Sequence, residues 1–434
     1  MARTRKTDYL LIGGGVAAAR AIETIRREDR RGRILLVGAE RQLPYDRPPL
    51  SKEIITGTVQ PREIVTERRR YYRTHRARLL RGRRVTGLEL SEESEREGTA
   101  ELDDGSRVVF SRALLATGGR PRRLGVPGED TGVHYLRNVD DALEIAQAVS
   151  GRDNTRAVVV GGGLIGLELA ASLRLRGTGV TLIEAQDRLW PPTAPRPLRD
   201  YLLRRMEEIG VTVHLGESVE RIEGGRSGHV VHATRAGRLE CEVVCAAVGI
   251  EPNDELARAA GVEVEDGVLV DGHFRTSDSR VYAAGDLVRF RDPYSGVWRR
   301  VEHYNNAEYG GLLAGQNMAG GDAPFEFLSN FWSDIGELHI EMAGNDTEWE
   351  ELVTRGALDR PSEGAETGVP QWIGIGMNGS RIACYFAVNA PPADLSALQL
   401  LIRNRVDVSG DAERLSDPGE PLAEIARDAL EAAS

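Results

Sequence analysis

Two short glycine-rich segments have the residue types and the spacing that bind phosphate groups. In the pattern Gly-x-Gly-x-x-Gly/Ala, the first glycine allows a tight turn, the second lets a pyrophosphate approach the backbone, and the third small residue keeps the next helix close. A helix that begins at such a turn offers its N–H groups to the phosphates. The residues are Gly13, Gly15 and Ala18 in the first segment and Gly161, Gly163 and Gly166 in the second. The pattern predicts two dinucleotide sites.

The elements around each turn are those that such a site requires. "DYLLIGGGVAAARAIETIRREDRRGRILLVGAE" starts as an apolar strand, continues as an amphipathic helix and ends in a second strand with Glu40; the second segment repeats this order and ends in Glu184. An acid there accepts hydrogen bonds from a ribose. The acid Glu184 would repel the 2'-phosphate of NADPH, and the residues after it, Ala185 and Gln186, offer no basic group to bind that phosphate. We expect a resident flavin, FAD, and a diffusible NADH.

Two further residues are candidates by type and context. Lys52, in "LPYDRPPLSKE", is one of only two lysines among the 56 basic residues, which indicates a demand for a compact ammonium whose protonation a buried site can tune. Accident is the alternative explanation. Asp286 follows an apolar run and Gly285, where an acid can accept a hydroxyl from a ribityl chain, although an ordinary strand-turn acid has the same pattern.

Composition limits the classes of protein. The 434 residues predict about three domains, and 41% apolar residues with 49 glycines are typical of a soluble α/β protein. A net charge of -11 argues against general nucleic-acid binding. No run approaches the roughly 18 apolar residues of a membrane span, and "MARTRKT" lacks the features of a signal peptide. The three cysteines form no CxxC pair, so we expect a cytoplasmic protein.

Charge is unevenly distributed along the chain. Residues 62–84 carry ten arginines against two acids, whereas residues 322–370 carry twelve acids against two arginines. Either cluster can be a solvated face. The basic cluster can instead be a docking surface for an acidic protein, near Arg68, Arg69, Arg70 and Arg73. The acidic segment 345–370 is rich in Glu and Gly and is expected to form a loop.

Beyond the two fingerprints, the chain resembles the FAD- and NAD-dependent ferredoxin reductases of oxygenase systems, and also the related apoptosis-inducing-factor-like flavoproteins. The motifs that carry the resemblance are "PYDRPPLSK", "LLATGGRPR", "VYAAGDLVRF", "RRVEHYNNAEYGGLLAGQNMAG", "FWSDIG" and "CYFAVNAPPADLSALQLLIRNRVDV". It implies an α/β fold with two Rossmann-like dinucleotide-binding domains, like those of glutathione reductase, and a small α+β C-terminal domain.

The resemblance also implies roles for individual residues. Lys52 would lie beside the flavin near N5 and pair with Glu168, Trp332 would lie over the flavin ring region, and His303, typical of the apoptosis-inducing-factor branch, would precede a helix aimed at the flavin. Besides Lys52, Trp332 and His303, FAD contacts are expected at Gly13, Gly15, Ala18, Glu40, Arg47, Pro48, Ala116, Thr117, Gly118, Gly285, Asp286 and Glu302. NAD contacts are expected at Gly161, Gly163, Gly166, Glu184 and Gly249.

Glycine-rich joints predict the domain boundaries. The FAD-binding domain is expected at 1–117 and 248–322, the NAD-binding domain at 118–247 and the C-terminal domain at 323–434. Within the C-terminal domain, alternating apolar residues around Asn378-Gly379 predict a hairpin. Asp394 is a candidate cap for a helix at 395–404.

Three functions follow from these residues. The favoured one is an NADH-dependent flavoprotein reductase that passes electrons to a small acidic ferredoxin. The second is an apoptosis-inducing-factor-like module that forms a charge-transfer complex with NADH and acts through partner binding, and the third is an NADH oxidase or quinone reductase. Residues 1–240 contain no cysteine, which argues against thiol-disulfide chemistry. A monomer or a homodimer is expected, with no metal, nucleic acid or membrane as partner.

Overall fold

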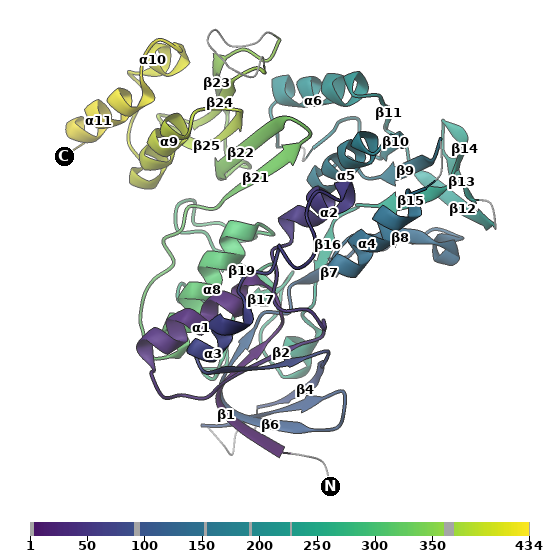
Figure 1. Ribbon diagram of the computed structural model, residues 1–434. Coiled ribbons are helices and arrows are strands. Elements are labelled where there is room, and N and C mark those ends of the chain that lie inside the picture. Colours follow the sequence, from purple (N-terminus) through teal and green to yellow (C-terminus); the bar gives the residue numbers. More distant parts are fainter. Residues whose placement is uncertain are drawn as a thin grey trace. The chain divides into compact units, whose positions relative to one another are not determined.

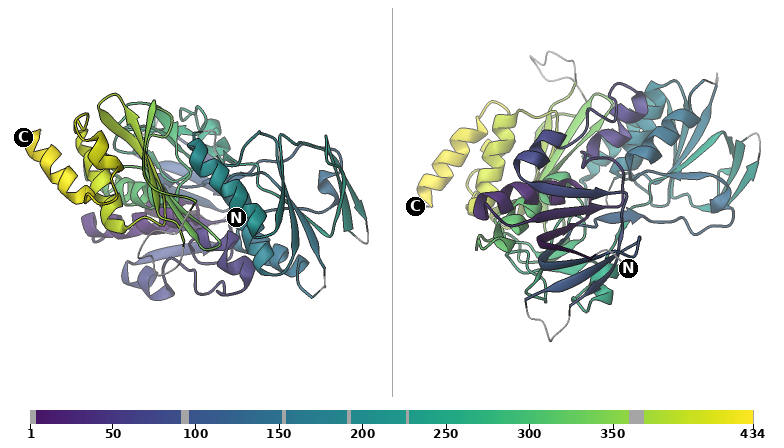
Figure 2. Two further views of the ribbon diagram at one scale, coloured as in Figure 1. Left: turned by 90° about the horizontal axis from the view of Figure 1, so that it is seen from above. Right: turned by 60° about the horizontal axis from the view of Figure 1, so that its bottom comes forward.

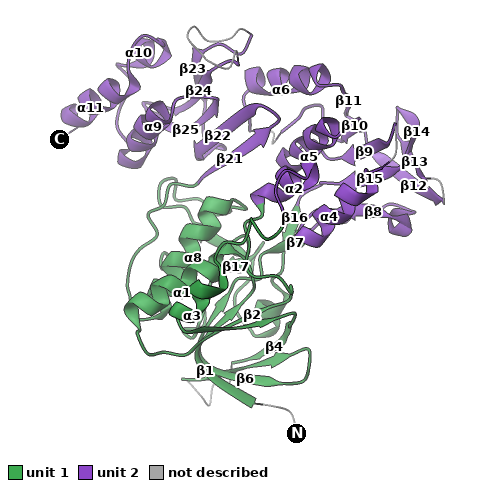
Figure 3. Cartoon of the chain, in the orientation of Figure 1, with its two compact units in different colours: residues 1–47, 61–120, 250–329 green, residues 48–60, 121–249, 330–434 purple. Residues whose placement is uncertain are grey.

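The protein is described by a computed structural model in which two compact units are distinguished (Figure 3). Unit 1 comprises Met1–Arg47, Pro61–Arg120 and Ile250–Ser329, and unit 2 comprises Pro48–Gln60, Pro121–Gly249 and Asn330–Ser434. The residues that the structure describes are 4–90, 96–151, 154–190, 193–225, 228–359 and 369–433. The division into three domains expected from the sequence stays a prediction.

Unit 1 is built on a seven-stranded sheet with the order β3-β2-β1-β6-β5-β4, in which β18 also pairs with β6. Strands β3, β2, β1, β6 and β18 run parallel, and β4 and β5 join them in antiparallel fashion. The run ILLVG of β2 is buried throughout, as in a parallel strand that is covered on both faces. The strands are β1 (Thr4–Ile12), β2 (Ile34–Gly38), β3 (Ala77–Arg81), β4 (Val85–Glu89), β5 (Gly98–Leu102), β6 (Arg107–Leu115) and β18 (Val281–Ala283).

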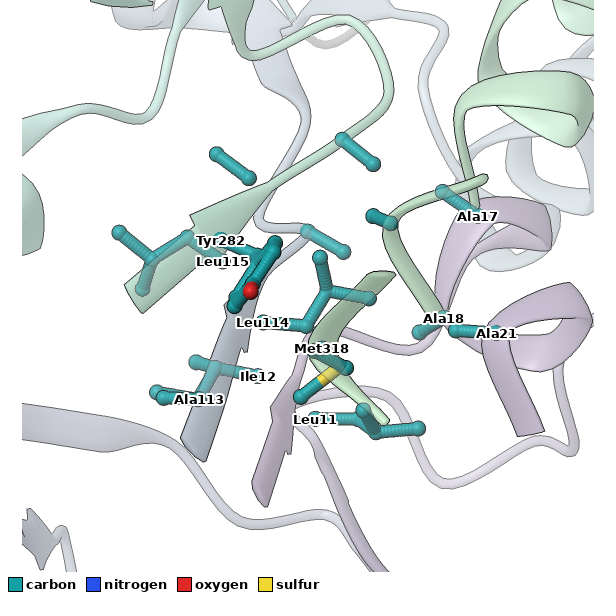
Figure 4. Close-up of a cluster of buried hydrophobic side chains, with 14 of the residues drawn as sticks. Leu11, Ile12, Ala17, Ala18, Ala21, Ala113, Leu114, Leu115, Tyr282 and Met318 are labelled. Carbon is teal, nitrogen blue, oxygen red and sulfur yellow. The ribbon is translucent and has the colours of Figure 1, made fainter. Parts of the chain in front are cut away.

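Two helices of unit 1, α1 (Val16–Glu28) and α8 (Tyr304–Met318), lie side by side (Figures 1 and 2). Glycines permit this approach, because a Cβ at Gly311 would lie 2.2 Å from the carbonyl oxygen of Ala17. Side chains from both helices join the strands in one apolar core (Figure 4). Smaller elements complete the unit: α3 (Arg69–Thr74), β16 (Ile250–Pro252), α7 (Glu255–Ala259), β17 (Val268–Leu269), β19 (Val288–Arg291) and β20 (Trp298–Arg300).

The nucleotide-binding part of unit 2 repeats this plan with a five-stranded parallel sheet of order β11-β10-β9-β15-β8. Its strands are β8 (Val133–Tyr135), β9 (Arg156–Val160), β10 (Gly179–Glu184), β11 (Val211–Leu215) and β15 (Val243–Ala246). A separate antiparallel sheet consists of β12 (Val219–Gly225), β13 (Gly228–Ala233) and β14 (Gly237–Cys241). The helices of this part are α4 (Val139–Ala148), α5 (Leu164–Leu175) and α6 (Arg196–Glu208).

The C-terminal part of unit 2 is an antiparallel sheet of order β21-β22-β25-β24-β23 followed by helices. The strands are β21 (Asn330–Ile335), β22 (Leu338–Gly344), β23 (Glu351–Gly356), β24 (Trp372–Asn378) and β25 (Arg381–Val388). The helices are α9 (Pro392–Asn404), α10 (Ala412–Ser416) and α11 (Leu422–Ala432). The hairpin predicted around Gly379 is confirmed, and so is the fold class of two Rossmann-like parts with an α+β C-terminal part.

Two details of the C-terminal part differ from expectation. Asp394 does not cap α9, because the helix already begins at Pro392, whose fixed φ suits the first helical position. The acidic segment expected to be a loop contains β23, whose Val353 and Arg355 pair with β24. Its residues 360–368 lie outside the described residues.

Candidate functional site

The first glycine turn, in unit 1, leaves an open space at a helix N-terminus. Gly13 has φ +130°, and a Cβ there would lie 2.0 Å from the carbonyl oxygen of Ala116. A Cβ at Gly15, which precedes α1, would meet no atom within 4 Å. No side chain caps α1 and its first turn holds no acid, so its N–H groups are available to an anion. Ala18 is fully buried beneath the turn.

The second turn, in unit 2, has the same geometry. Gly161 has φ +112°, and a Cβ there would lie 2.3 Å from the carbonyl oxygen of Ala247. Gly163 precedes α5 and faces open space, again without a capping side chain or an acid in the first turn. A Cβ at Gly166 would lie 1.9 Å from the oxygen of Gly161, so only glycine fits where the helix crosses the turn. Both turns therefore fit a pyrophosphate.

The acids at or just after the end of the second strand of each motif, Glu40 and Glu184, have different hydrogen-bond partners. Glu40 accepts hydrogen bonds from the hydroxyl of Tyr45 and, at 2.8 Å, from the guanidinium of Arg47. Glu184 instead accepts from two backbone N–H groups, those of Gly162 at 2.6 Å and Gln186 at 2.8 Å. The first acid is held by side chains, and the second by backbone N–H groups of the glycine turn and of the segment after β10.

Strand register brings the other expected FAD residues of unit 1 to one edge of the sheet. Leu115 of β6 lies between Ile12 of β1 and Ala283 of β18. Since these strands are parallel, the segments that follow them leave the sheet at the same edge, which is where ligands bind in such sheets. The segments carry Gly13, Gly15, Ala116, Thr117, Gly118, Gly285 and Asp286. This convergence is what a flavin dinucleotide requires.

Helix α8 begins directly after His303, as the sequence predicts. Its first turn has no acid and no side-chain cap, so its positive end is uncompensated by the helix itself. Burial and the charge of Arg299 lower the pKa of His303 to about 3, against the opposing effect of Asp286. The imidazole is therefore neutral at physiological pH. The neighbouring Glu302 forms an ion pair with Arg300.

Lys52 and Glu168 meet within unit 2. Lys52 lies between the 3-10 turn η1 (Pro48–Ser51) and α2 (Glu53–Thr56), and Glu168 lies on α5. The Lys52 Nζ is 3.5 Å from Glu168 Oε1 and 3.1 Å from Asp334 Oδ2. The hydroxyls of Ser51 and Ser333 donate to the two oxygens of Glu168 at 2.5 and 2.7 Å.

The charges of this cluster are strongly desolvated. The side chains of Lys52 and Glu168 are only 11% and 6% exposed. Burial alone would lower the pKa of Lys52, but the carboxylates of Glu168 and Asp334 raise it, so the ammonium stays charged. Burial raises the pKa of Glu168, against the effects of Lys52 and both serine hydroxyls. Since a buried ion pair is weak evidence for stability, the cluster is a candidate for function.

Trp332 belongs to the hairpin β21–β22. Its side chain is half-buried, whereas Phe331 and Ile335, on the other face of β21, are buried. The register places Trp332 opposite Glu341 and Asp334 opposite His339. The indole is thus not simply a member of the apolar core.

Sequence reasoning missed four residues of the Lys52 cluster, namely Ser51, Ser333, Asp334 and His339. A signal for the last two exists. Gly336-Glu337 sits between alternating residues and marks a two-residue hairpin loop, which would have placed Asp334 opposite His339. No local pattern shows that Ser51 and Ser333 reach Glu168, because they lie 117 and 165 residues away in the chain.

The expected docking arginines lie on the surface of unit 1 around α3. The helix is fixed by Tyr72, which is buried, and by Tyr71, whose hydroxyl donates to Ala19. Among the described residues, no carboxylate forms an ion pair with these arginines, although Arg83 pairs with Asp104. All four expected docking residues, Arg68, Arg69, Arg70 and Arg73, are exposed.

The cysteines are not placed for thiolate chemistry. Cys241, Cys245 and Cys384 are all buried, and none of the three is in a disulfide bond. Burial raises the pKa of Cys241 and of Cys245 to about 12, so both stay protonated thiols. In the described part of the chain no group of three or more His, Cys, Asp or Glu residues could hold a metal ion. No helix described here is long and apolar enough to cross a membrane.

Comparison with known families decides what this arrangement is. Residues 7–311 match the family described as pyridine nucleotide-disulphide oxidoreductase, and residues 330–426 match the one described as reductase C-terminal. The chain belongs to the pyridine nucleotide-disulphide oxidoreductase family. As a member of this family it is an oxidoreductase that uses FAD and NAD(H), and its two open glycine turns fit both dinucleotides.

Individual proteins are similar to this chain over nearly its whole length. The ferredoxin–NAD(+) reductase component of the anthranilate 1,2-dioxygenase system from Burkholderia cepacia is 35% identical over 94% of this chain and 97% of the relative. The solved covalent complex of putidaredoxin reductase and putidaredoxin matches with TM-score 0.88 at 29% identity, over 98% of this chain and 99% of that one. A ferredoxin reductase from Rhodopseudomonas palustris matches with TM-score 0.88 at 26% identity, over 97% and 100%. The resemblance found in the sequence is confirmed.

Proposed function

We propose that this protein is an NADH-dependent FAD flavoprotein that transfers electrons to a ferredoxin-type iron–sulfur protein. The observation that carries the proposal is the presence of both nucleotide turns and a reductase C-terminal part in one chain that matches ferredoxin reductase components almost end to end. The two alternatives, a partner-binding module and an oxidase or quinone reductase, have no comparable support. A cytoplasmic location and a monomeric or homodimeric state stay predictions.

The proposal assigns the two dinucleotides to the two units. In unit 1 the first glycine turn, with Glu40, Arg47 and the ends of β6 and β18, holds FAD. Its uncapped helix α1 supports this, because four N–H groups at a helix start need an acceptor. In unit 2 the second turn, with Glu184 and Gly249, binds NADH. The carboxylate of Glu184 would repel a 2'-phosphate and so favour NADH over NADPH.

The remaining residues receive roles in hydride transfer. When bound, FAD would supply the chemistry of accepting a hydride and releasing electrons singly. Lys52 supplies a fixed positive charge, and Glu168 orients it; their low exposure supports this role, because a charge in a dry site acts more strongly than one in water. Trp332 and His303 contact the flavin, as the resemblance implies, and the neutral state of His303 keeps a second positive charge away from it.

The exposed arginines around α3 are proposed to dock an acidic ferredoxin. Arg68, Arg69, Arg70 and Arg73 have no carboxylate partner among the described residues and so can attract an acidic partner over a distance. Such attraction weakens with added salt, since the Debye length is roughly 10 Å at 0.1 M.

One set of measurements tests the function. The purified protein should be yellow, its flavin should be bleached by NADH without oxygen, and NADH-driven reduction of a ferredoxin encoded beside the gene should exceed direct reduction of oxygen or quinone. Reducing the charge with Arg69→Gln and Arg73→Gln should raise the KM for ferredoxin without changing the rate of flavin bleaching. A long-lived charge-transfer band without ferredoxin reduction would favour the partner-binding module instead.

A further inference from the structure

The Lys52 cluster does not end at Asp334. The carboxylate of Asp334 uses its two oxygens for two cations: Oδ2 is 3.1 Å from Lys52 Nζ, and Oδ1 is 2.7 Å from His339 Nδ1. Lys52 Nζ also lies 3.5 Å from Glu168 Oε1, and the other ring nitrogen of His339 lies 3.9 Å from Glu341 Oε2. Acidic and basic groups therefore alternate along the row from Glu168 to Glu341.

The position of His339 is fixed by its neighbours. Its backbone N–H donates to Asn389 Oδ1 at 2.8 Å, and the N–H of Asn389 donates back to the His339 carbonyl. Glu341 is held by the hydroxyl of Tyr385 at 2.8 Å, and Gln399 of α9 donates to that hydroxyl.

The charged and titratable groups around the imidazole come from several elements. Glu341 and Tyr385 lie on β22 and β25, Arg403 of α9 acts on Tyr385, and Asp334 lies on β21. The hydrogen bond to Asp334, with a further effect of the nearby Glu341 carboxylate, raises the pKa of His339 to about 9. The imidazole is therefore a cation at physiological pH.

We propose that His339 is a positioning residue that acts on Lys52 through Asp334, by occupying one carboxylate oxygen and sharing the negative charge of that carboxylate. His339 is not among the site residues predicted from the sequence. The proposal rests on the function proposed above, because it concerns how Lys52 is presented for hydride transfer.

The effect on Lys52 follows from charge balance. While His339 is protonated, it neutralises part of the charge on Asp334, and Lys52 is shared between Asp334 and Glu168. When His339 is neutral, the whole charge of Asp334 acts on Lys52 and draws the ammonium away from Glu168, which is already the more distant of its two partners at 3.5 Å. Glu168 is buried and would then lose its counter-charge, so its pKa would rise further.

Coupling between two sites is reciprocal, which gives a direct test on the holoprotein. With only eight histidines in the chain, the ring signals of His339 can be followed by NMR with labelled histidine and assigned from their loss in His339→Gln. In the unaltered protein His339 should titrate near pH 9. Asp334→Asn should lower this value by about 2 units, toward the ordinary value of about 6.5.

The decisive variant is Lys52→Gln. Removing the competing cation leaves Asp334 wholly to His339, so the His339 titration should move upward by about 0.5 unit or more. Glu337→Gln is the matched control, since it removes one charge from the same hairpin and, among the described residues, Glu337 forms an ion pair with Arg205 alone; it should shift the His339 titration by less than about 0.3 unit. A His339 that titrates near 6.5, or that responds equally to both variants, overturns the proposal.

A kinetic measurement connects the coupling to the reaction. The rate of flavin reduction by NADH, followed by stopped flow from pH 6 to 10, should change around pH 9 in the unaltered protein and lose that step in His339→Gln. His339→Lys, which keeps the positive charge, should restore the neutral-pH rate without a step at pH 9. If NADH fails to reduce the flavin in any variant, the proposed function fails, but the NMR titrations still decide the role of His339. A step at pH 9 that persists in His339→Gln contradicts the proposal.

Discussion

The two nucleotide turns are nearly identical in sequence pattern, yet they differ at two points. In unit 2 the third position must be glycine, because a Cβ at Gly166 would collide with the oxygen of Gly161, whereas unit 1 accommodates the methyl group of Ala18. The acid of unit 1 is clamped by Tyr45 and Arg47, whereas Glu184 accepts hydrogen bonds from the backbone N–H groups of Gly162 and Gln186.

Under the proposed assignment of FAD to unit 1 and NADH to unit 2, this difference would correspond to two kinds of binding. A clamp of side chains around Glu40 adds contacts that can retain a nucleotide, as a resident cofactor requires. The arrangement around Glu184 offers fewer side-chain contacts to a nucleotide, as suits one that must dissociate after each turnover. One backbone pattern thus serves both tasks, and side chains outside the pattern distinguish them.

The largest effect is expected from the third position of the turn. Gly166→Ala should destabilise unit 2 by about 3 kcal/mol, because the new Cβ meets a backbone carbonyl that cannot rotate away. The reciprocal change Ala18→Gly should cost only about 1 kcal/mol, from helix propensity and a lost methyl group. Thermal unfolding followed by circular dichroism measures both. Equal losses in the two variants would show that the turns are packed alike.

A smaller effect is expected from the open second glycine. A methyl group at Gly163 meets no atom of the described residues within 4 Å, so Gly163→Ala should keep its unfolding temperature but bind NADH about tenfold more weakly, since the pyrophosphate loses its close approach. Gly15→Ala should lower the flavin content and leave the NADH affinity per bound flavin unchanged. Loss of flavin in Gly163→Ala, with NADH binding intact, would reverse the assignment of the two turns.

The smallest effect concerns the acid of the second turn. Glu184→Gln removes the charge that would repel a 2'-phosphate, so the preference for NADH over NADPH, measured as a ratio of kcat/KM values, should fall by about tenfold. The control Glu40→Gln should leave this ratio unchanged, because Glu40 belongs to the other turn. An unaltered ratio in Glu184→Gln would assign nucleotide choice to other residues.

Much of the nucleotide-binding architecture could be predicted because it is local in the chain. Each glycine turn and its two strands fall within about 35 residues, and the strand, helix and turn patterns agree with one another. The hairpin at Gly379 was predicted for the same reason, whereas the helix after His303 was implied by the family resemblance. The wrong cap at Asp394 shows the limit of such patterns, because Pro392 was an equally good start signal two residues earlier.

The buried charge cluster is a different case. Resemblance to a family pointed to Lys52 and Glu168, but the residues that hold them, Ser51, Ser333 and Asp334, follow no spacing rule. They meet because η1, α5 and β21 pack together in unit 2. The sequence shows only that a lysine was kept in a chain rich in arginine.

The sequence by itself determined the two nucleotide turns, since a positive φ or a close backbone approach at a few glycines is a property of neighbouring residues. Tertiary structure alone decided that Asp334 lies beside Lys52 together with Glu168, and how His339 joins them. The physical reason is that hydrogen bonds between side chains depend on distances in space, and the chain brings Lys52 to Asp334 across 282 residues.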